Sequence, residues 1–230
     1  MLKLLVFDLD GTLADTRHDL AMSVNYALTK VGRSTLPLET VVSFVGDGAR
    51  SLITRGLEAS GNGEADGAEI ESALGVFLEH YRGHCLESTK AYPGVGESLE
   101  NLSGYRMAVL TNKPEAPARR ILAGLGLSRH FNKIMGGDNA FGPKPDPAAL
   151  RHIMAVESAD PGETAMIGDG LQDLRVSRRA GARFLGFLGG MGSPEALLAE
   201  NPDAVFEDMR ALPRAVAELE ARTTTAGGRP

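Results

Sequence analysis

Two carboxylates stand two residues apart where a short apolar run ends. Asp8 and Asp10 follow the run at residues 3–7, and Gly11 and Thr12 come next. Side chains two residues apart on an extended chain point to the same side, so both carboxylates are expected to face one site. One could serve as nucleophile or metal ligand and the other as general acid and base. The residues after them allow a tight turn and supply backbone N–H groups.

Three further polar segments follow apolar runs and suit a phosphate ester. Thr111 and Asn112 offer a hydroxyl, an amide and free N–H groups at a helix start, where phosphate binds well. Lys144 lies between prolines in a stiff loop and could neutralise a phosphate and a carboxylate. Asp169 and Asp173, spaced i and i+4, could hold a metal ion. Mg²⁺ takes one or two carboxylates together with water and phosphate oxygens, so these residues predict a magnesium site.

Short apolar runs alternate with amphipathic stretches along most of the chain. The runs are bounded by Gly, Pro, Asn or Asp, as buried strands of a parallel sheet are. The predicted strands cover residues 3–7, 106–110, 132–135, 165–167, 183–187 and 204–206. The predicted helices between and after them cover residues 114–125, 146–156, 171–180 and 209–219. This alternation indicates an α/β fold with a doubly wound, Rossmann-like parallel sheet, which binds ligands at the carboxyl ends of its strands.

One region interrupts the alternation. Residues 16–87 contain no expected strand, and their spacing predicts helices over 17–31, 38–44, 48–59 and 68–86. A helical insertion after the first strand indicates a cap domain over residues 16–87, inserted into a core domain of residues 1–15 and 88–221. The final residues, 222–230, lack apolar periodicity and are expected to form a disordered tail.

The ordered motifs resemble the haloacid dehalogenase-like (HAD) hydrolase superfamily. The motifs are Asp8-Leu-Asp10-Gly-Thr12, Thr111-Asn112, Lys144 and Gly168-Asp169 with Asp173. The helical insertion is similar to the C1 cap of that superfamily. The resemblance implies a Mg²⁺-dependent phosphatase in which Asp8 attacks phosphorus and becomes an aspartyl-phosphate. It also implies that Asp10 protonates the leaving alcohol and then activates water.

The same resemblance assigns the phosphate-binding residues. Thr111 and Asn112 would bind the phosphoryl group, with help from the turn that contains Gly11 and Thr12. Lys144 would stabilise the charge of the group in transfer. Phosphoryl transfer needs little beyond positioning and electrostatic stabilisation, so these roles agree with the chemistry.

The metal site is the last part of the resemblance. Mg²⁺ would lie between Asp8, the backbone carbonyl of Asp10 and Asp169, with Asp173 as a ligand or behind the ligands. Gly170 departs from the pattern, since many relatives have Ser or Thr there. The missing hydroxyl predicts looser support of the metal ligands, but no carboxylate is lost.

The segment over residues 44–52 bears on the substrate. Arg50 follows the turn Gly46-Asp47-Gly48, which could reach the core site and let the arginine pair with a second anionic group, such as a carboxylate. A surface arginine beside a turn is the alternative. The sequence VGDGAR of this segment and the segment 81–95 are similar to bacterial phosphoglycolate phosphatases. The resemblance therefore implies 2-phosphoglycolate as the preferred substrate.

Three other functions remain open at this point. The protein could be a phosphatase of another small metabolite or of pyrophosphate, or a sugar-phosphate mutase, whose cap also carries an arginine in a similar loop. It could also be a non-enzymatic binding module on the same fold. Loss of Asp8 or Lys144 would indicate such a module, and both residues are present.

The composition excludes several other classes of protein. The chain has 24 basic and 30 acidic residues and a net charge of −6, which argues against nucleic acid as a partner. A single cysteine, Cys85, allows neither an intrachain disulfide nor a zinc–thiolate cluster. No apolar run reaches the roughly 18 residues of a membrane span, and acidic residues come too early for a signal peptide. We expect a cytoplasmic monomer or homodimer that acts on a small phosphorylated metabolite, with no membrane partner.

Overall fold

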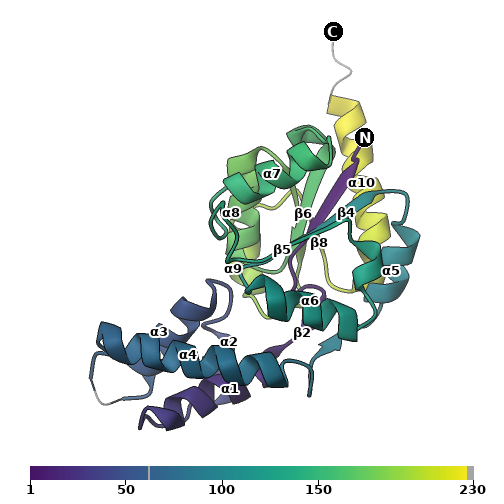
Figure 1. The fold of residues 1–230 in the computed structure, drawn as a ribbon. Helices are drawn as coiled ribbons and strands as arrows, with labels where there is room; N and C mark the ends of the chain where they lie inside the picture. The colour runs from purple at the N-terminus through teal and green to yellow at the C-terminus, as the bar shows by residue number, and fades with distance from the viewer. Residues whose placement is uncertain (62, 227–230) are drawn as a thin grey trace.

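A six-stranded parallel sheet forms the centre of the protein in the computed structural model, which describes residues 1–61 and 63–226 (Figure 1). The strands are β1 (Leu4–Phe7), β4 (Arg106–Leu110), β5 (Lys133–Met135), β6 (Thr164–Gly168), β7 (Arg183–Phe187) and β8 (Ala204–Phe206). Their order in the sheet is β5-β4-β1-β6-β7-β8. Because β1 pairs with both β4 and β6, Phe7 lies between Val109 and Ile167 in the register. Each apolar run that the sequence analysis identifies as a strand is a strand of this sheet.

Helices cover both faces of the sheet. One face carries α7 (Ala148–Val156), α8 (Leu171–Ala180) and α9 (Pro194–Ala199), and the other carries α5 (Val95–Asn101), α6 (Glu115–Gly124) and α10 (Leu212–Ala226). Within β1, Leu4 and Val6 join the buried cluster on the first face, while Leu5 and Phe7 join the cluster on the second. A strand covered on both faces needs such a continuous apolar run. The predicted doubly wound α/β fold is confirmed.

Four helices form a cap at the carboxyl ends of the strands (Figure 1). They are α1 (Arg17–Lys30), α2 (Leu38–Val42), α3 (Ala49–Ala59) and α4 (Gly67–His84). α4 packs against both α1 and α3, and the buried side chains of Leu28, Leu57 and Phe77 belong to the apolar core there. These helices agree with the four predicted helices to within two residues at each end, as is usual for helix boundaries.

A short sheet joins the cap to the core. β2 (Ala14–Asp15) pairs antiparallel with β3 (Lys90–Ala91) where the chain leaves the core and returns to it. The sequence analysis misses this sheet, because two residues carry no periodic pattern. Asp19 in α1 is completely buried and accepts hydrogen bonds from the backbone N–H groups of Ser88 and Thr89. These bonds hold the two crossing segments together.

The end of the chain differs from the prediction. The backbone is helical from Leu212 to Ala226, after one 3₁₀ turn at Met209–Ala211, whereas the sequence analysis predicts a helix over 209–219 and a disordered tail from 222. That prediction relied on an apolar stripe. Glutamate, alanine and arginine at 220–222 favour a helix without such a stripe, whereas the three threonines at 223–225 do not, so helix propensity accounts only for the first part of the extension. The rest of the predicted tail, residues 227–230, lies outside the described residues.

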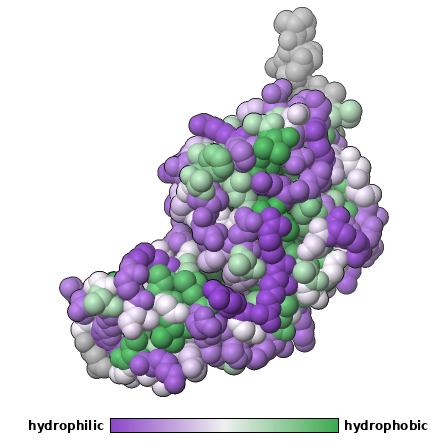
Figure 2. Space-filling model, in the orientation of Figure 1, coloured by the Kyte–Doolittle hydropathy of each residue, from purple (hydrophilic) through white to green (hydrophobic). Residues whose placement is uncertain are grey.

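The surface is mainly hydrophilic on the face shown in Figure 2, with apolar areas on the cap and near the centre of the core. The exposed large apolar residues are scattered over several elements, from Met22 in α1 to Val205 in β8. Within the described part of the chain, no helix is both long enough and apolar enough to cross a membrane.

Candidate active site

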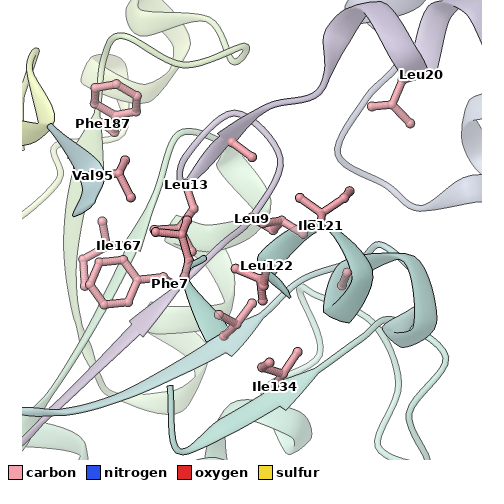
Figure 3. Close-up of a cluster of buried hydrophobic side chains, with 14 of the residues drawn as sticks. Phe7, Leu9, Leu13, Leu20, Val95, Ile121, Leu122, Ile134, Ile167 and Phe187 are labelled. Carbon is pink, nitrogen blue, oxygen red and sulfur yellow. The ribbon is translucent and has the colours of Figure 1, made fainter. Parts of the chain in front are cut away.

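The two carboxylates after β1 lie at the junction of core and cap. Phe7 and Leu9 are completely buried, and Figure 3 shows both side chains within the apolar cluster of the core. Asp8 and Asp10 alternate with them and line the cavity between core and cap. The backbone N–H of Asp8 still donates to the carbonyl of Ile167 at 2.9 Å, so the sheet positions the first carboxylate directly. Both carboxylates line the same cavity, as their spacing of two residues predicts.

Lys144 is the cation in contact with Asp8. Its Nζ lies 2.8 Å from Asp8 Oδ1 and 2.6 Å from Asp173 Oδ1, and only 2% of its side chain is exposed. Burial lowers the pKa of Lys144, but the charges of Asp173 and Asp8 outweigh burial and raise the pKa above its ordinary value. The lysine therefore stays protonated and keeps a positive charge beside the proposed nucleophile.

Three carboxylates lie close together beside Lys144, which contacts two of them, Asp8 and Asp173. Asp8, Asp169 and Asp173 each place one oxygen within 4.8 Å of the others. Asp169 Oδ2 also accepts hydrogen bonds from the backbone N–H groups of Met191 at 2.8 Å and Gly192 at 2.9 Å. Burial and the charge of Asp8 nevertheless raise the pKa of Asp169 to about 6, and the same causes raise the pKa of Asp173. A cluster of oxygen donors with excess negative charge fits a divalent cation that prefers oxygen ligands.

Gly11 and Thr12 support Asp169 instead of facing a phosphate. Gly11 has a φ of +81°, and a Cβ at this position would lie 2.1 Å from Asp169 Oδ2, so only glycine fits. The N–H of Gly11 donates to the carbonyl of Ala14 at 3.0 Å, and the hydroxyl of Thr12 donates to Asp169 Oδ1 at 2.9 Å. In this structure the N–H of Gly11 is used within the turn and the hydroxyl of Thr12 at Asp169, so neither of these donors faces a phosphate site, and phosphate binding by the two residues stays a prediction.

Asn112 differs from its expected role as well. Its side-chain oxygen accepts from the N–H of Lys144 at 2.7 Å, and its amide donates to the carbonyls of Lys144 at 3.0 Å and Gly46 at 2.8 Å. Its polar atoms are therefore used to hold the lysine loop and to contact the cap. Thr111 keeps the expected place, because it lines the cavity and its hydroxyl accepts from the N–H of Lys113 at 3.3 Å. The hydroxyl proton of Thr111 remains available for a phosphoryl oxygen.

Gly170 supports the acidic cluster through its backbone. Its N–H donates to Asp173 Oδ2 at 3.1 Å. A Cβ at Gly170 would lie 3.4 Å from the same oxygen, so the Ser or Thr of many relatives would bring a hydroxyl beside Asp173. A Ser or Thr at this position would keep the same backbone N–H, so the missing hydroxyl concerns Asp173 and nothing else at residue 170 replaces it.

Arg50 does not reach the cavity. It pairs with Glu71 at the surface of the cap, where 59% and 61% of the two side chains are exposed, and it does not line the cavity. This placement agrees with the alternative of a surface arginine and does not support the prediction that Arg50 binds a substrate carboxylate. The turn before Arg50 does reach the core, since Gly46 contacts Asn112 and Asp47 accepts a hydrogen bond from Gln172.

The cavity between core and cap has a volume of about 330 Å³. Its core side is polar and includes Asp8, Asp10, Thr111, Asn112 and Lys113. Its cap side is mostly apolar and includes Leu20, Val45, Leu52, Phe77 and Tyr81. The carboxylates therefore lie on the core side, and a mostly apolar cap wall faces them across the cavity.

Lys113 is a site residue that the sequence analysis does not assign. Its Nζ lies 3.1 Å from Asp10 Oδ1 and 2.7 Å from the hydroxyl of Tyr81, and 3% of its side chain is exposed. The signal was its position directly after Thr111 and Asn112, in a segment already chosen for phosphate. Tyr81 comes from α4, so this contact joins cap and core beside the second carboxylate.

Comparisons with known proteins identify the family. Residues 5–187 match the family model described as haloacid dehalogenase-like hydrolase. The chain is 36% identical to a phosphoglycolate phosphatase of Psychrobacter arcticus, over 91% of this chain and 94% of the relative. It is 38% identical to phosphoglycolate phosphatase 1 of Pseudomonas aeruginosa, over 91% of this chain and 78% of the relative.

A solved structure agrees with these sequence relatives. The crystal structure of a predicted phosphoglycolate phosphatase from Haemophilus somnus is similar with a TM-score of 0.86 and 30% identity, over 92% of this chain and 96% of that one. Family model, relatives and fold point the same way, and the motifs that carry the resemblance are those at the strand ends. The chain belongs to the haloacid dehalogenase-like hydrolase family.

Proposed function

We propose that the protein is a phosphomonoester hydrolase that acts through an aspartyl-phosphate and prefers 2-phosphoglycolate. The observation that carries this proposal is the placement of Asp8 between Lys144 and a second carboxylate, Asp10, at one side of a covered cavity. Relatives named phosphoglycolate phosphatase, at 36–38% identity, support the choice of substrate.

The first half of the reaction uses both carboxylates. A carboxylate oxygen of Asp8 attacks phosphorus, and the bond between phosphorus and the ester oxygen breaks. Asp10 gives its proton to the departing oxygen, which leaves as an alcohol. Lys144, held next to Asp8, stabilises the charge on the phosphoryl oxygens, and the hydroxyl of Thr111 can donate to one of them.

The second half restores the enzyme. Asp10, now ionised, takes a proton from a water molecule. The oxygen of that water attacks the phosphorus of the aspartyl-phosphate. The bond between Asp8 and phosphorus breaks, and inorganic phosphate leaves. Thr16 donates a hydrogen bond to Asp10 Oδ1 at 2.7 Å and so orients this carboxylate.

The acidic cluster fits Mg²⁺ as the cofactor. Asp8 and Asp169 would hold it together with the backbone carbonyl of Asp10, and Asp173 would bind it or support the ligands. When bound, the ion supplies positive charge to the phosphoryl oxygens. When ionised, the three carboxylates carry three negative charges, and Lys144, which contacts Asp8 and Asp173, offsets one of them, so two remain for a divalent cation.

Phosphate release from a small panel of substrates tests the proposed function. The panel holds 2-phosphoglycolate, β-glucose 1-phosphate, pyrophosphate and p-nitrophenyl phosphate, each with and without Mg²⁺. We expect Mg²⁺-dependent release and the highest kcat/KM for 2-phosphoglycolate. A best activity on another member would reject the substrate and keep the chemistry. No release from any of them, with metal present, would reject the hydrolase proposal.

Mg²⁺ binding is expected to weaken at acid pH. The pKa of Asp169 is raised to about 6, so protons compete with the metal below that pH. The apparent Kd for Mg²⁺ should be nearly constant above pH 7 and rise by about tenfold for each pH unit below 6, because one proton is displaced. The shift of Tm with Mg²⁺ concentration, measured from pH 5 to pH 8, gives this Kd.

A matched control keeps this measurement specific. The Asp169→Asn variant lacks the titrating ligand, so its remaining affinity should depend less on pH over the same range. A wild-type Kd that stays constant from pH 5 to pH 8 would contradict the assignment of Asp169 as a ligand.

A further inference from the structure

Lys113 is the buried cation beside Asp10 and lines the cavity, whereas Lys144 contacts Asp8 and is not among the lining residues. Its Nζ contacts Asp10 Oδ1 at 3.1 Å and the Tyr81 hydroxyl at 2.7 Å, and it lies 4.3 Å from the centre of the Tyr81 ring. Lys144 is occupied by Asp8 and Asp173. The mechanism above uses Asp10 and leaves Lys113 and Tyr81 without a task.

Both side chains keep a hydrogen-bond donor to spare. A lysine ammonium has three donors, and the described residues, 1–61 and 63–226, provide acceptors for two of those of Lys113. An ammonium can only donate, so the Tyr81 oxygen accepts in this contact, and the phenol proton has no acceptor within the same residues. Burial, with the nearby charge of Asp10, raises the pKa of Tyr81 well above its ordinary value, so the phenol keeps that proton.

Two spare donors beside a fixed positive charge suit a carboxylate. Both residues line the cavity, and both are nearly buried, with residue exposures of 6% for Lys113 and 3% for Tyr81. Leaving buried donors unpaired costs free energy, which a ligand with two acceptor oxygens recovers. The remaining cap wall near them is apolar, including Leu52 and Phe77, and offers little to a sugar hydroxyl.

Other cations near the cavity fit this task less well. Arg50 is 59% exposed, pairs with Glu71 and lies outside the cavity lining. Arg82 lines the cavity, but 73% of its side chain is exposed, so solvent screens its charge. Lys113 is the buried cation of the three. It contacts Asp10, the carboxylate that must also contact the leaving oxygen.

We propose that Lys113 and Tyr81 form the subsite that binds the carboxylate of the substrate. The inference rests on the proposed function, in which Asp10 lies next to the leaving oxygen. That position defines the distance from the leaving oxygen to Lys113. An anionic group one carbon from that oxygen lies within reach of a cation that touches Asp10. The subsite therefore selects phosphomonoesters of short α-hydroxy acids. Since Tyr81 belongs to the cap and Lys113 to the core, it is complete only when the cap covers the core.

A pair of substrates that differ only in this charge tests the subsite. 2-Phosphoglycolate carries the carboxylate, and 2-hydroxyethyl phosphate has the same chain length with a neutral hydroxymethyl group. In Lys113→Met we expect kcat/KM for 2-phosphoglycolate to fall about 10²-fold, as for a lost charged hydrogen bond, and the preference over the neutral ester to disappear. In Tyr81→Phe the preference should fall about tenfold, mainly through KM.

Controls separate this role from other effects. Lys30→Met removes an exposed cap lysine and should keep the wild-type preference. Tm measurements establish that the variants fold, and Tyr81→Phe, which keeps the ring, carries the test if Lys113→Met does not fold. Arg50→Ala should also keep the preference.

The outcomes distinguish the two proposals. A wild type without preference for 2-phosphoglycolate over the neutral ester rejects the proposed substrate, and the subsite with it. A wild-type preference that survives in both Lys113→Met and Tyr81→Phe, with equal losses on the two esters, leaves the proposed function intact. It would show that Lys113 only orients Asp10, and the subsite is then rejected. A preference lost in Arg50→Ala instead would assign the carboxylate to Arg50.

Discussion

Asp8→Asn is expected to lower kcat by about 10⁴-fold or more on every substrate, because an amide of the same shape cannot attack phosphorus. The fold should persist. Asp8 contributes to the raised pKa of both Asp169 and Asp173, so its neutral replacement relieves repulsion within the cluster. We expect a metal-free Tm equal to that of the wild type or slightly higher, measured next to phosphate release at saturating Mg²⁺.

The control for this variant is Asp66→Asn. Asp66 is an exposed N-cap of α4 whose side chain accepts from the N–H of Glu69, and asparagine caps helices equally well. This variant should keep both full activity and stability. Substantial Mg²⁺-dependent turnover by Asp8→Asn would exclude Asp8 as the nucleophile, whatever its Tm.

Lys144→Met should reduce both activity and stability. The neutral side chain fills similar space but removes the cation that contacts Asp8 and Asp173, at 2.8 Å and 2.6 Å. Loss of charge stabilisation in the transition state should lower kcat by about 10³-fold. Loss of one partner from a buried ionic group should lower the free energy of unfolding of the metal-free protein by about 3–5 kcal/mol at neutral pH.

The stability of Lys144→Met should depend on pH in a definite direction. The carboxyl pKa values in the folded protein lie above those of the unfolded chain, so the folded state binds more protons between pH 4 and pH 6. Stability therefore falls as pH rises through that window, and it falls further in Lys144→Met, where no cation offsets the carboxylates. Mg²⁺ should restore part of the lost stability at pH 7.5. Urea unfolding at pH 4 and at pH 7.5 measures these differences.

Lys30→Met is again the matched control, since this exposed lysine has no contact with the carboxylates. It should change the free energy of unfolding by less than about 1 kcal/mol at either pH. If Lys144→Met is as stable as this control in the absence of metal, the carboxylates near Lys144 are not charged together, and the account of the acidic cluster is wrong.

Local patterns were sufficient for most of the fold. The six strands and four cap helices follow from runs and spacings within ten to twenty residues, which reflect the geometry of the backbone itself. Where no local pattern exists, prediction failed, as for the two-residue strands β2 and β3. The helical backbone up to Ala226 was missed for a related reason, since the prediction relied on an apolar stripe and residues 222–226 have none.

The site shows the same division at finer scale. Asp8, Asp10, Lys144, Asp169 and Asp173 could be named in advance, because each follows a strand whose carboxyl end meets the same edge of the sheet. The hydrogen-bond partners of the uncharged residues could not be predicted from the sequence. Asn112 and Thr12 bear donors that suit phosphate, yet these donors bond to Lys144 and Gly46 and to Asp169 respectively.

The sequence by itself predicted the carboxylates and the lysine of the candidate site, and the tertiary structure decided which other side chains line the cavity. Asp8 and Asp10 lie two residues apart directly after β1, so the local geometry of the chain favours the same side for both, and both line the cavity. Whether Arg50 or Lys113 faces that cavity depends on how the cap lies on the core. Lys113 meets Tyr81 across 32 residues, and Arg50 is turned outward to Glu71. Such contacts arise from packing between distant segments, which no local spacing encodes.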